Sequence, residues 1–142
     1  MSRRQLWILL ALSVLTASTV LLYREHPWRD DSPILQIPCA NVVAGCQLSG
    51  QGARVIFDQR PQPMQPFRLR VEVLNAHEVH ASFAMQGMQM GLNRYRLLPG
   101  EVGVWTALII LPVCVQGRSD WVMTLNLDGQ RYGLPFVAES TR

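Results

Sequence analysis

Residues 67–73 read Phe67-Arg68-Leu69-Arg70-Val71-Glu72-Val73. Apolar side chains alternate strictly with charged ones over the whole stretch. Because successive side chains of a β-strand point to opposite faces of its sheet, this alternation predicts a strand with one face in a core and the other in water. Almost no helical periodicity accompanies it between residues 34 and 142. The stretch therefore decides the fold class.

Similar period-two patterns recur on both sides of this stretch. Together with a longer apolar run at residues 102–111, which Pro112 terminates, they predict further strands at residues 53–57, 79–85, 102–111, 121–127 and 131–137. Asp128-Gly129, between the last two strands, suits a tight type I′ hairpin, because this dipeptide tolerates positive φ angles. Six or seven short strands separated by turn signals predict a mainly β protein, an immunoglobulin-like (Ig-like) antiparallel β-sandwich.

The N-terminal residues predict a membrane anchor. Arg3 and Arg4 precede an uncharged apolar stretch at residues 6–23, and a spanning helix needs about 17–25 such residues. Arginines on the short side favour the cytoplasm, so the rest of the chain is expected in the periplasm. A cleaved signal peptide is the competing interpretation, with residues 17–19 as a mediocre cleavage site. The expected order is a cytoplasmic N-terminus (1–5), a single-pass transmembrane signal-anchor in the inner (plasma) membrane (6–23), a tether (24–33) and one periplasmic domain (34–142).

The charge balance and the missing motifs exclude two classes of function. Two of the 13 basic residues precede the apolar stretch, so 11 basic residues face all 10 acidic ones in the rest of the chain. Nothing resembles the clustered basic stripe that binds nucleic acid. No nucleophile elbow, phosphate-binding glycine loop or apolar carboxylate pair stands out, and we expect no enzyme.

Three cysteines, Cys39, Cys46 and Cys114, follow the predicted anchor. In an oxidising compartment they predict one disulfide and one leftover thiol. Cys39–Cys46 closes a short loop and is the preferred pairing. A bridge from either of them to Cys114 would instead join the start of the domain to its late strands, and this alternative stays open.

A methionine run at residues 83–91 (FAMQGMQMG) suggests a metal site. Thioethers are soft ligands that select Cu(I). Met85 is expected to point inward, so Met88 and Met90 are the better candidates. A pair of thioethers needs a further ligand, which Cys114 or His80 would supply. The competing interpretation is that these methionines fill gaps in a small core.

The order of landmarks resembles a known family. The alternating strand is followed by the methionine run, by Gly103-Val104-Trp105-Thr106-Ala107 and by Gly117-Arg118-Ser119-Asp120-Trp121. Over residues 66–137 this order resembles the small YtkA-like and FixH-like extracytoplasmic domains. The resemblance implies a β-sandwich similar to copper-resistance domains and, for FixH-like members, a part in copper supply to respiratory oxidases.

Two functions follow as hypotheses. In the first, a membrane-anchored periplasmic β-sandwich assists copper handling or respiratory-oxidase maturation, with Cu(I) bound and an oxidase-assembly or copper-transport protein as partner. In the second, a metal-free membrane-tethered interaction domain binds another membrane or periplasmic protein. Its contact surface would be Asn93-Arg94-Tyr95-Arg96, because tyrosine and arginine are enriched at interface hot spots. The same four residues also suit a charged edge strand that prevents aggregation.

Overall fold

The computed structural model describes residues 3–24, 33–48, 50, 52–88, 93–114 and 116–139. The chain divides into two compact units, residues 1–31 and residues 32–142. Both sheets and the buried core of the described residues lie in the second unit. This domain therefore contains the contacts it needs to fold without the first unit.

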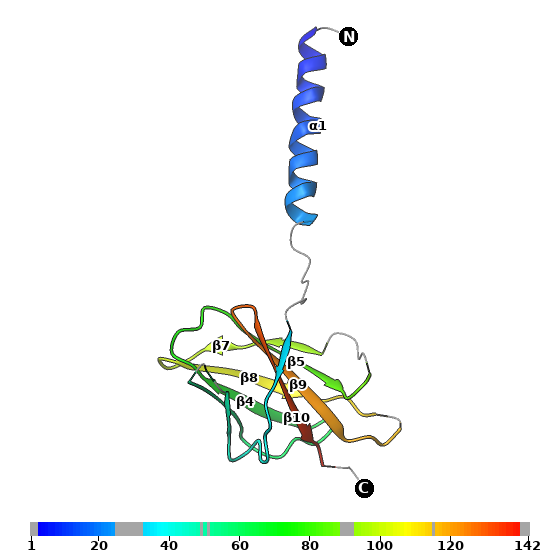
Figure 1. The fold of residues 1–142 in the computed structure, drawn as a ribbon. Helices are drawn as coiled ribbons and strands as arrows, with labels where there is room; N and C mark the ends of the chain where they lie inside the picture. Colours follow the sequence, from blue (N-terminus) through cyan, green and yellow to red (C-terminus); the bar gives the residue numbers. More distant parts are fainter. Residues whose placement is uncertain are drawn as a thin grey trace. The chain divides into compact units, whose positions relative to one another are not determined.

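Helix α1 (Arg3–Arg24) belongs to the first unit (Figure 1). Its leucines and alanines are good helix formers. The hydroxyl groups of Ser13 and Thr16 donate hydrogen bonds to carbonyl oxygens one turn earlier, at 2.8 and 3.0 Å, so these polar groups are satisfied within the helix. Over the residues whose side chains the structure describes, no helix is long and apolar enough to cross a membrane.

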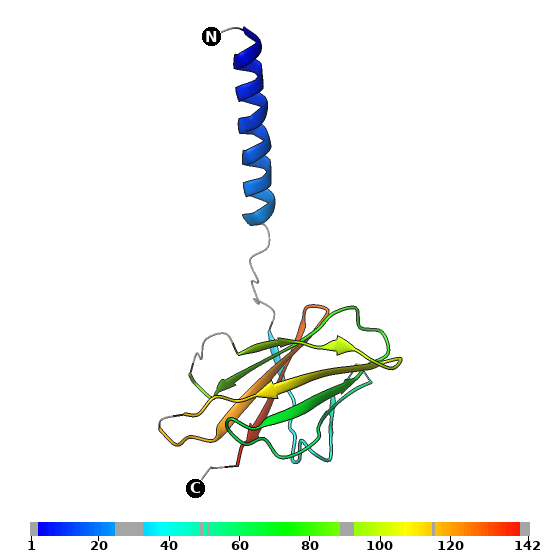
Figure 2. The same cartoon turned by 180° about the vertical axis from the view of Figure 1, so that it is seen from behind.

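Ten strands form two five-stranded sheets in the described part of the second unit (Figure 1). Sheet A has the order β1 (Ile34–Gln36), β10 (Gln130–Val137), β9 (Asp120–Leu127), β5 (Val79–Met85) and β6 (Arg94–Arg96). Sheet B has the order β2 (Cys46–Leu48), β3 (Ala53–Phe57), β4 (Pro66–Glu72), β8 (Val104–Ile110) and β7 (Leu98–Pro99). Figure 2 shows the sandwich from the side of sheet B.

The core lies between the two sheets and follows the alternation of the sequence. Every second residue of β4, β5 and β9 is buried. Aromatic rings join the sheets edge to face, with ring centroids 6.2 Å apart for Phe67 and Phe83 and 5.4 Å apart for Phe57 and Phe136. Such pairs add stability beyond the area that they bury.

The six predicted strands are all present, as β3, β4, β5, β8, β9 and β10. The predicted total of six or seven strands is wrong. Four further strands, β1, β2, β6 and β7, have only two or three residues each and are too short to show an alternation of apolar and polar residues. The prediction of a wholly antiparallel sandwich is also wrong, since β1 pairs in parallel with β10. No hairpin joins these two strands, so their connection does not force an antiparallel direction.

The predicted hairpin between β9 and β10 is confirmed. Asp128 and Gly129 have φ angles of 49° and 91°, as a type I′ turn requires. The Asp128 carboxylate accepts the main-chain N–H groups of His77 at 3.0 Å and Glu78 at 2.7 Å. These hydrogen bonds, the one from His77 first, hold the pKa of Asp128 below its usual value. The turn is therefore fastened to the segment that precedes β5.

The preferred disulfide is confirmed. Cys39 and Cys46 are bonded, with their Cα atoms 5.5 Å apart. Cys114 is the free cysteine among the described residues, and it is half-buried. The alternative bridges to Cys114 are therefore not formed, and the domain keeps one thiol.

Candidate functional site

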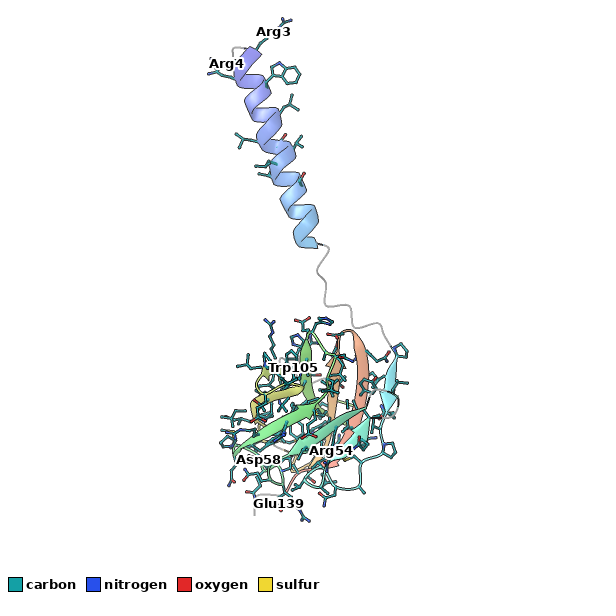
Figure 3. All side chains as sticks on the ribbon, turned by 90° about the vertical axis from the view of Figure 1, so that its left-hand side faces the viewer. Arg3, Arg4, Arg54, Asp58, Trp105 and Glu139 are labelled. Atoms are coloured by element: carbon teal, nitrogen blue, oxygen red, sulfur yellow. A yellow bond between two sulfur atoms is a disulfide. The ribbon has the colours of Figure 1, made fainter. Side chains whose placement is uncertain are left out.

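Three segments from different parts of the chain meet at one end of the domain. The connection from β8 to β9 holds Cys114, and its first residue, Leu111, accepts a hydrogen bond from the main-chain N–H of Met64 at 2.8 Å. The turn after β5 lies against the same connection. We call this region, residues 61–64, 86–88, 111–114 and 116–119, the thiol end. The main-chain N–H of Glu139 donates to Pro61 here, at 2.8 Å, and Figure 3 shows Glu139 and Trp105 toward opposite ends of the domain.

Arg118 joins the turn after β5 to the connection that carries the thiol. Its guanidinium donates to the carbonyl oxygen of Gln86 at 2.9 Å and to the Asp120 carboxylate at 2.9 Å. The main-chain N–H of Gln86 in turn donates to the carbonyl oxygen of Asp120 at 3.2 Å. Asp120 raises the pKa of Arg118, and the nearby Cys114 adds a smaller electrostatic contribution in the same direction. The thiol therefore lies within electrostatic range of the group that holds the turn.

The structure separates the candidate methionines by their surroundings. Met85 points into the core beside Phe83 and is 2% exposed. Met88 follows a turn at Gly87, whose φ is 74°, and it is half-buried against the edge of the core. Its main-chain N–H donates to Met85 at 3.0 Å, which fixes the turn. Met90 lies outside the described residues.

Met64 is a soft donor that the sequence reasoning did not select. It lies in the proline-rich connection before β4 and is 65% exposed. Its φ of 62° is unusual for a residue other than glycine. Its main-chain hydrogen bond to Leu111 brings it to the thiol end, and no local pattern of the sequence marks that pairing. The positive φ of Met64 is seen in the structure and could not be predicted from the sequence.

His80 does not lie with the thiol end. It precedes Met85 by five positions in the extended strand β5, a distance of about 17 Å. His80 Nε2 lies 2.8 Å from the Glu78 carboxylate, and this hydrogen bond lowers the pKa of Glu78. His77 Nδ1 lies 3.4 Å from Asp128 at the same far end. The two histidines thus have carboxylate partners and are separated from Cys114.

The described residues contain no group of three or more His, Cys, Asp and Glu side chains that could hold a metal ion. Such a group includes no methionine, whereas two of the three described sulfur donors of the thiol end, Met64 and Met88, are thioethers. Soft sulfur donors bind Cu(I) in preference to the oxygen-seeking ions. A cavity of about 570 Å³ borders this region, and its wall includes Arg60, Gln86, Asp120, Trp121 and Glu139.

The four residues predicted to bind a partner form a short edge strand and the residue before it. Arg94 and Arg96 are exposed, whereas Tyr95 packs its ring against Phe83 with centroids 6.0 Å apart. The Tyr95 hydroxyl donates to the carbonyl oxygen of Ile110 at 2.9 Å. Asn93 accepts the main-chain N–H of Phe83 at 2.9 Å. Tyr95 and Asn93 therefore hold the strand in place, and the two arginines are available to a partner.

The geometry defines a two-sheet β-domain with a sulfur-bearing end. Comparison with known proteins finds no matching family model, no matching curated protein and no matching solved structure.

Proposed function

We propose that this domain binds and passes on Cu(I) at its thiol end. The observation that supports the proposal is that the three segments carrying Met64, Met88 and Cys114, which are far apart in the sequence, contact one another at the thiol end: Met64 through Leu111, and the turn of Met88 through Arg118. None of the three is needed to fill the centre of the core, since all are half-buried or exposed. A role in metal binding accounts for soft donors at one end of a domain better than packing does.

In this proposal the domain binds copper in order to transfer it and does not keep it as a permanent cofactor. A thiolate with one or two thioethers is a donor set that selects Cu(I). All three described donors come from connections between strands, where a small movement can open the site without disturbing the sheets. Such a site suits capture and release, whereas a closed cage suits permanent retention.

The proposal includes the place of the domain in the cell. The uncharged sequence from 6 to 23 would anchor the chain in the inner membrane as a single-pass helix, with the Ig-like domain in the periplasm. An oxidising compartment agrees with the disulfide between Cys39 and Cys46. The resemblance of residues 66–137 to YtkA-like and FixH-like domains points to copper supply for a respiratory oxidase. Alkaline carbonate extraction of the full chain from membranes tests the anchor, and release into the supernatant would contradict it.

A Cu(I) competition titration tests the metal site. Residues 33–142 are titrated under anaerobic conditions with ascorbate, which keeps copper reduced. We expect stoichiometric uptake and a loss of affinity in Met88→Leu, Met64→Leu and Cys114→Ser. A residue that does not touch the metal and only orients one of its ligands typically contributes about 10–100-fold to metal affinity. Removal of a ligand itself should therefore lower the affinity by at least that factor. Met123→Leu, at a buried position of β9, is the control. Uptake that none of the three substitutions weakens would overturn the assignment.

A further inference from the structure

Strand β6 forms one edge of sheet A, and its register directs main-chain groups to the open side. It pairs with β5 on one side and with no described strand on the other. Asn93 accepts a main-chain hydrogen bond from β5 and Leu97 donates one to it, each at 2.9 Å. Because the N–H and C=O groups of an antiparallel strand point alternately to its two sides, those of Arg94 and Arg96 point to the open side. Within the described residues they have no main-chain partner there.

The side chains of the same two arginines lie on the outer face of sheet A. Arg94 is directly opposite Ser82, and Arg96 is directly opposite His80. Residues opposite each other share a face, and Ala81, between Ser82 and His80, is buried on the inner one. Both arginines are exposed. The open side of β6 therefore presents main-chain groups and positive charges together.

Neither Arg94 nor Arg96 forms an ion pair within the described residues. One acid, Glu78, is affected by Arg96: the hydrogen bond from His80 is the largest cause that lowers the pKa of Glu78, and Arg96 adds a smaller electrostatic contribution. The domain thus neutralises these two charges only in part. Three other arginines of the domain do pair with carboxylates, namely Arg60, Arg70 and Arg118.

The other three edge strands lack this combination. Strands β1 and β2 contain no charged residue. Strand β7 has only two residues, and one of them, Pro99, has no N–H to donate. Among the strands that the structure describes, open main-chain groups and charged side chains therefore coincide at the edge formed by β6.

We propose that the open side of β6 binds an extended acidic segment of another protein, which adds to sheet A as a further strand. A polypeptide offers N–H and C=O groups at the spacing of a strand, which lipids and nucleic acids do not. A second copy of β6 would place arginine opposite arginine, and like charges in that position destabilise a sheet. Asp or Glu at alternate positions of the added strand would instead lie on the same face as Arg94 and Arg96.

NMR of residues 33–142 labelled with nitrogen-15 tests the inference. The probe is a short capped peptide of alternating glutamate and valine. We expect the peptide to slow hydrogen exchange of the Arg94 and Arg96 amides, because their N–H groups gain acceptors. The Tyr95 amide faces β5 and should change little, and binding should weaken as salt rises. Arg94 and Arg96 amides that do not respond to the peptide would overturn the inference.

Two control peptides separate strand addition from attraction between charges. A peptide with lysine in place of glutamate keeps the strand pattern and reverses the charge, so it should not bind. A peptide with N-methylated main-chain amides keeps its carboxylates but cannot pair as a strand. It should bind about five-fold more weakly for each main-chain hydrogen bond that is lost. Binding of either control peptide as tight as that of the probe would overturn the inference.

Variants of the domain test the two arginines. Arg94→Gln with Arg96→Gln should weaken binding of the acidic peptide by up to about 25-fold, from up to about five-fold for each exposed ion pair. Arg60→Gln removes an arginine whose side chain is 74% exposed and which lies outside β6, so it should leave binding unchanged. An unchanged affinity in the double variant, or an equal loss in Arg60→Gln, would overturn the inference. These variants keep every sulfur donor, so neither result bears on Cu(I) binding.

Discussion

Met85 and Met88 are three residues apart and should respond in opposite ways to substitution. Met85 is 2% exposed and lies in the ladder opposite Trp121, so its side chain is part of the core. Truncation of a buried methionine to alanine typically costs about 2–5 kcal/mol of unfolding free energy. The shape-conserving change Met85→Leu should cost less than about 1.5 kcal/mol. Met88 is half-buried, and Met88→Leu should change stability by no more than about 0.5 kcal/mol.

Urea denaturation followed by tryptophan fluorescence measures the stability of each variant. The Cu(I) titration measures its affinity for the metal. With a urea dependence of about 1–3 kcal/mol per M, Met85→Ala should lower the midpoint by about 1–2 M. Met85→Leu should unfold nearly as the parent does and should bind Cu(I) equally well. Met88→Leu should keep its midpoint and lose affinity for Cu(I) by at least about ten-fold.

The reverse pattern would refute the reasoning. If Met85→Leu lost Cu(I) while Met88→Leu retained it, the division between a structural and a ligating methionine would be wrong. If both retained it, the metal would bind elsewhere. A large loss of stability in Met88→Leu would show that this side chain belongs to the core.

Three further predictions concern the stability of the domain and are measured by urea denaturation. Replacing Cys39 and Cys46 together by serine should lower the unfolding free energy by about 2–3 kcal/mol, as expected for a loop with a sequence separation of 7; an unchanged midpoint would contradict the bond. Tyr95→Phe should cost about 1–2 kcal/mol, because the hydroxyl makes two hydrogen bonds with Ile110. Asp128→Asn should cost about 1–2 kcal/mol at neutral pH, where the charged acceptor is lost. Because the folded state lowers the pKa of Asp128, this contribution is complete above the ordinary aspartate pKa of about 3.9 and disappears as the pH falls through the lower folded value. A difference between Asp128→Asn and the parent that persisted at the acid end would contradict this assignment.

Strong alternation made the long strands predictable. In β4, β5 and β9 each buried residue is followed by one that is more exposed, so local sequence already contains the division between core and solvent. The strands of two or three residues exist because neighbours offer them partners. Leu98, for example, is in a strand only because Thr106 lies opposite, and this information is non-local.

The candidate site was predictable in part for the same reason. The methionine run and the single leftover cysteine stood out as residue types, and the turn and the connection that carry them do meet. Met64 did not stand out, since its place depends on a contact with Leu111, far along the chain. His80 was a candidate for the further ligand, but it precedes Met85 by five positions in an extended strand, which places it far from the turn that carries Met88.

X-ray absorption spectroscopy of the Cu(I)-loaded domain at the copper K-edge tests the central claim most directly. The measurement identifies the atoms bonded to copper. The account predicts a shell of sulfur atoms only, which loses its thiolate contribution in Cys114→Ser and loses a thioether in Met88→Leu. A nitrogen atom in the shell, or a domain that takes up no copper, would contradict it.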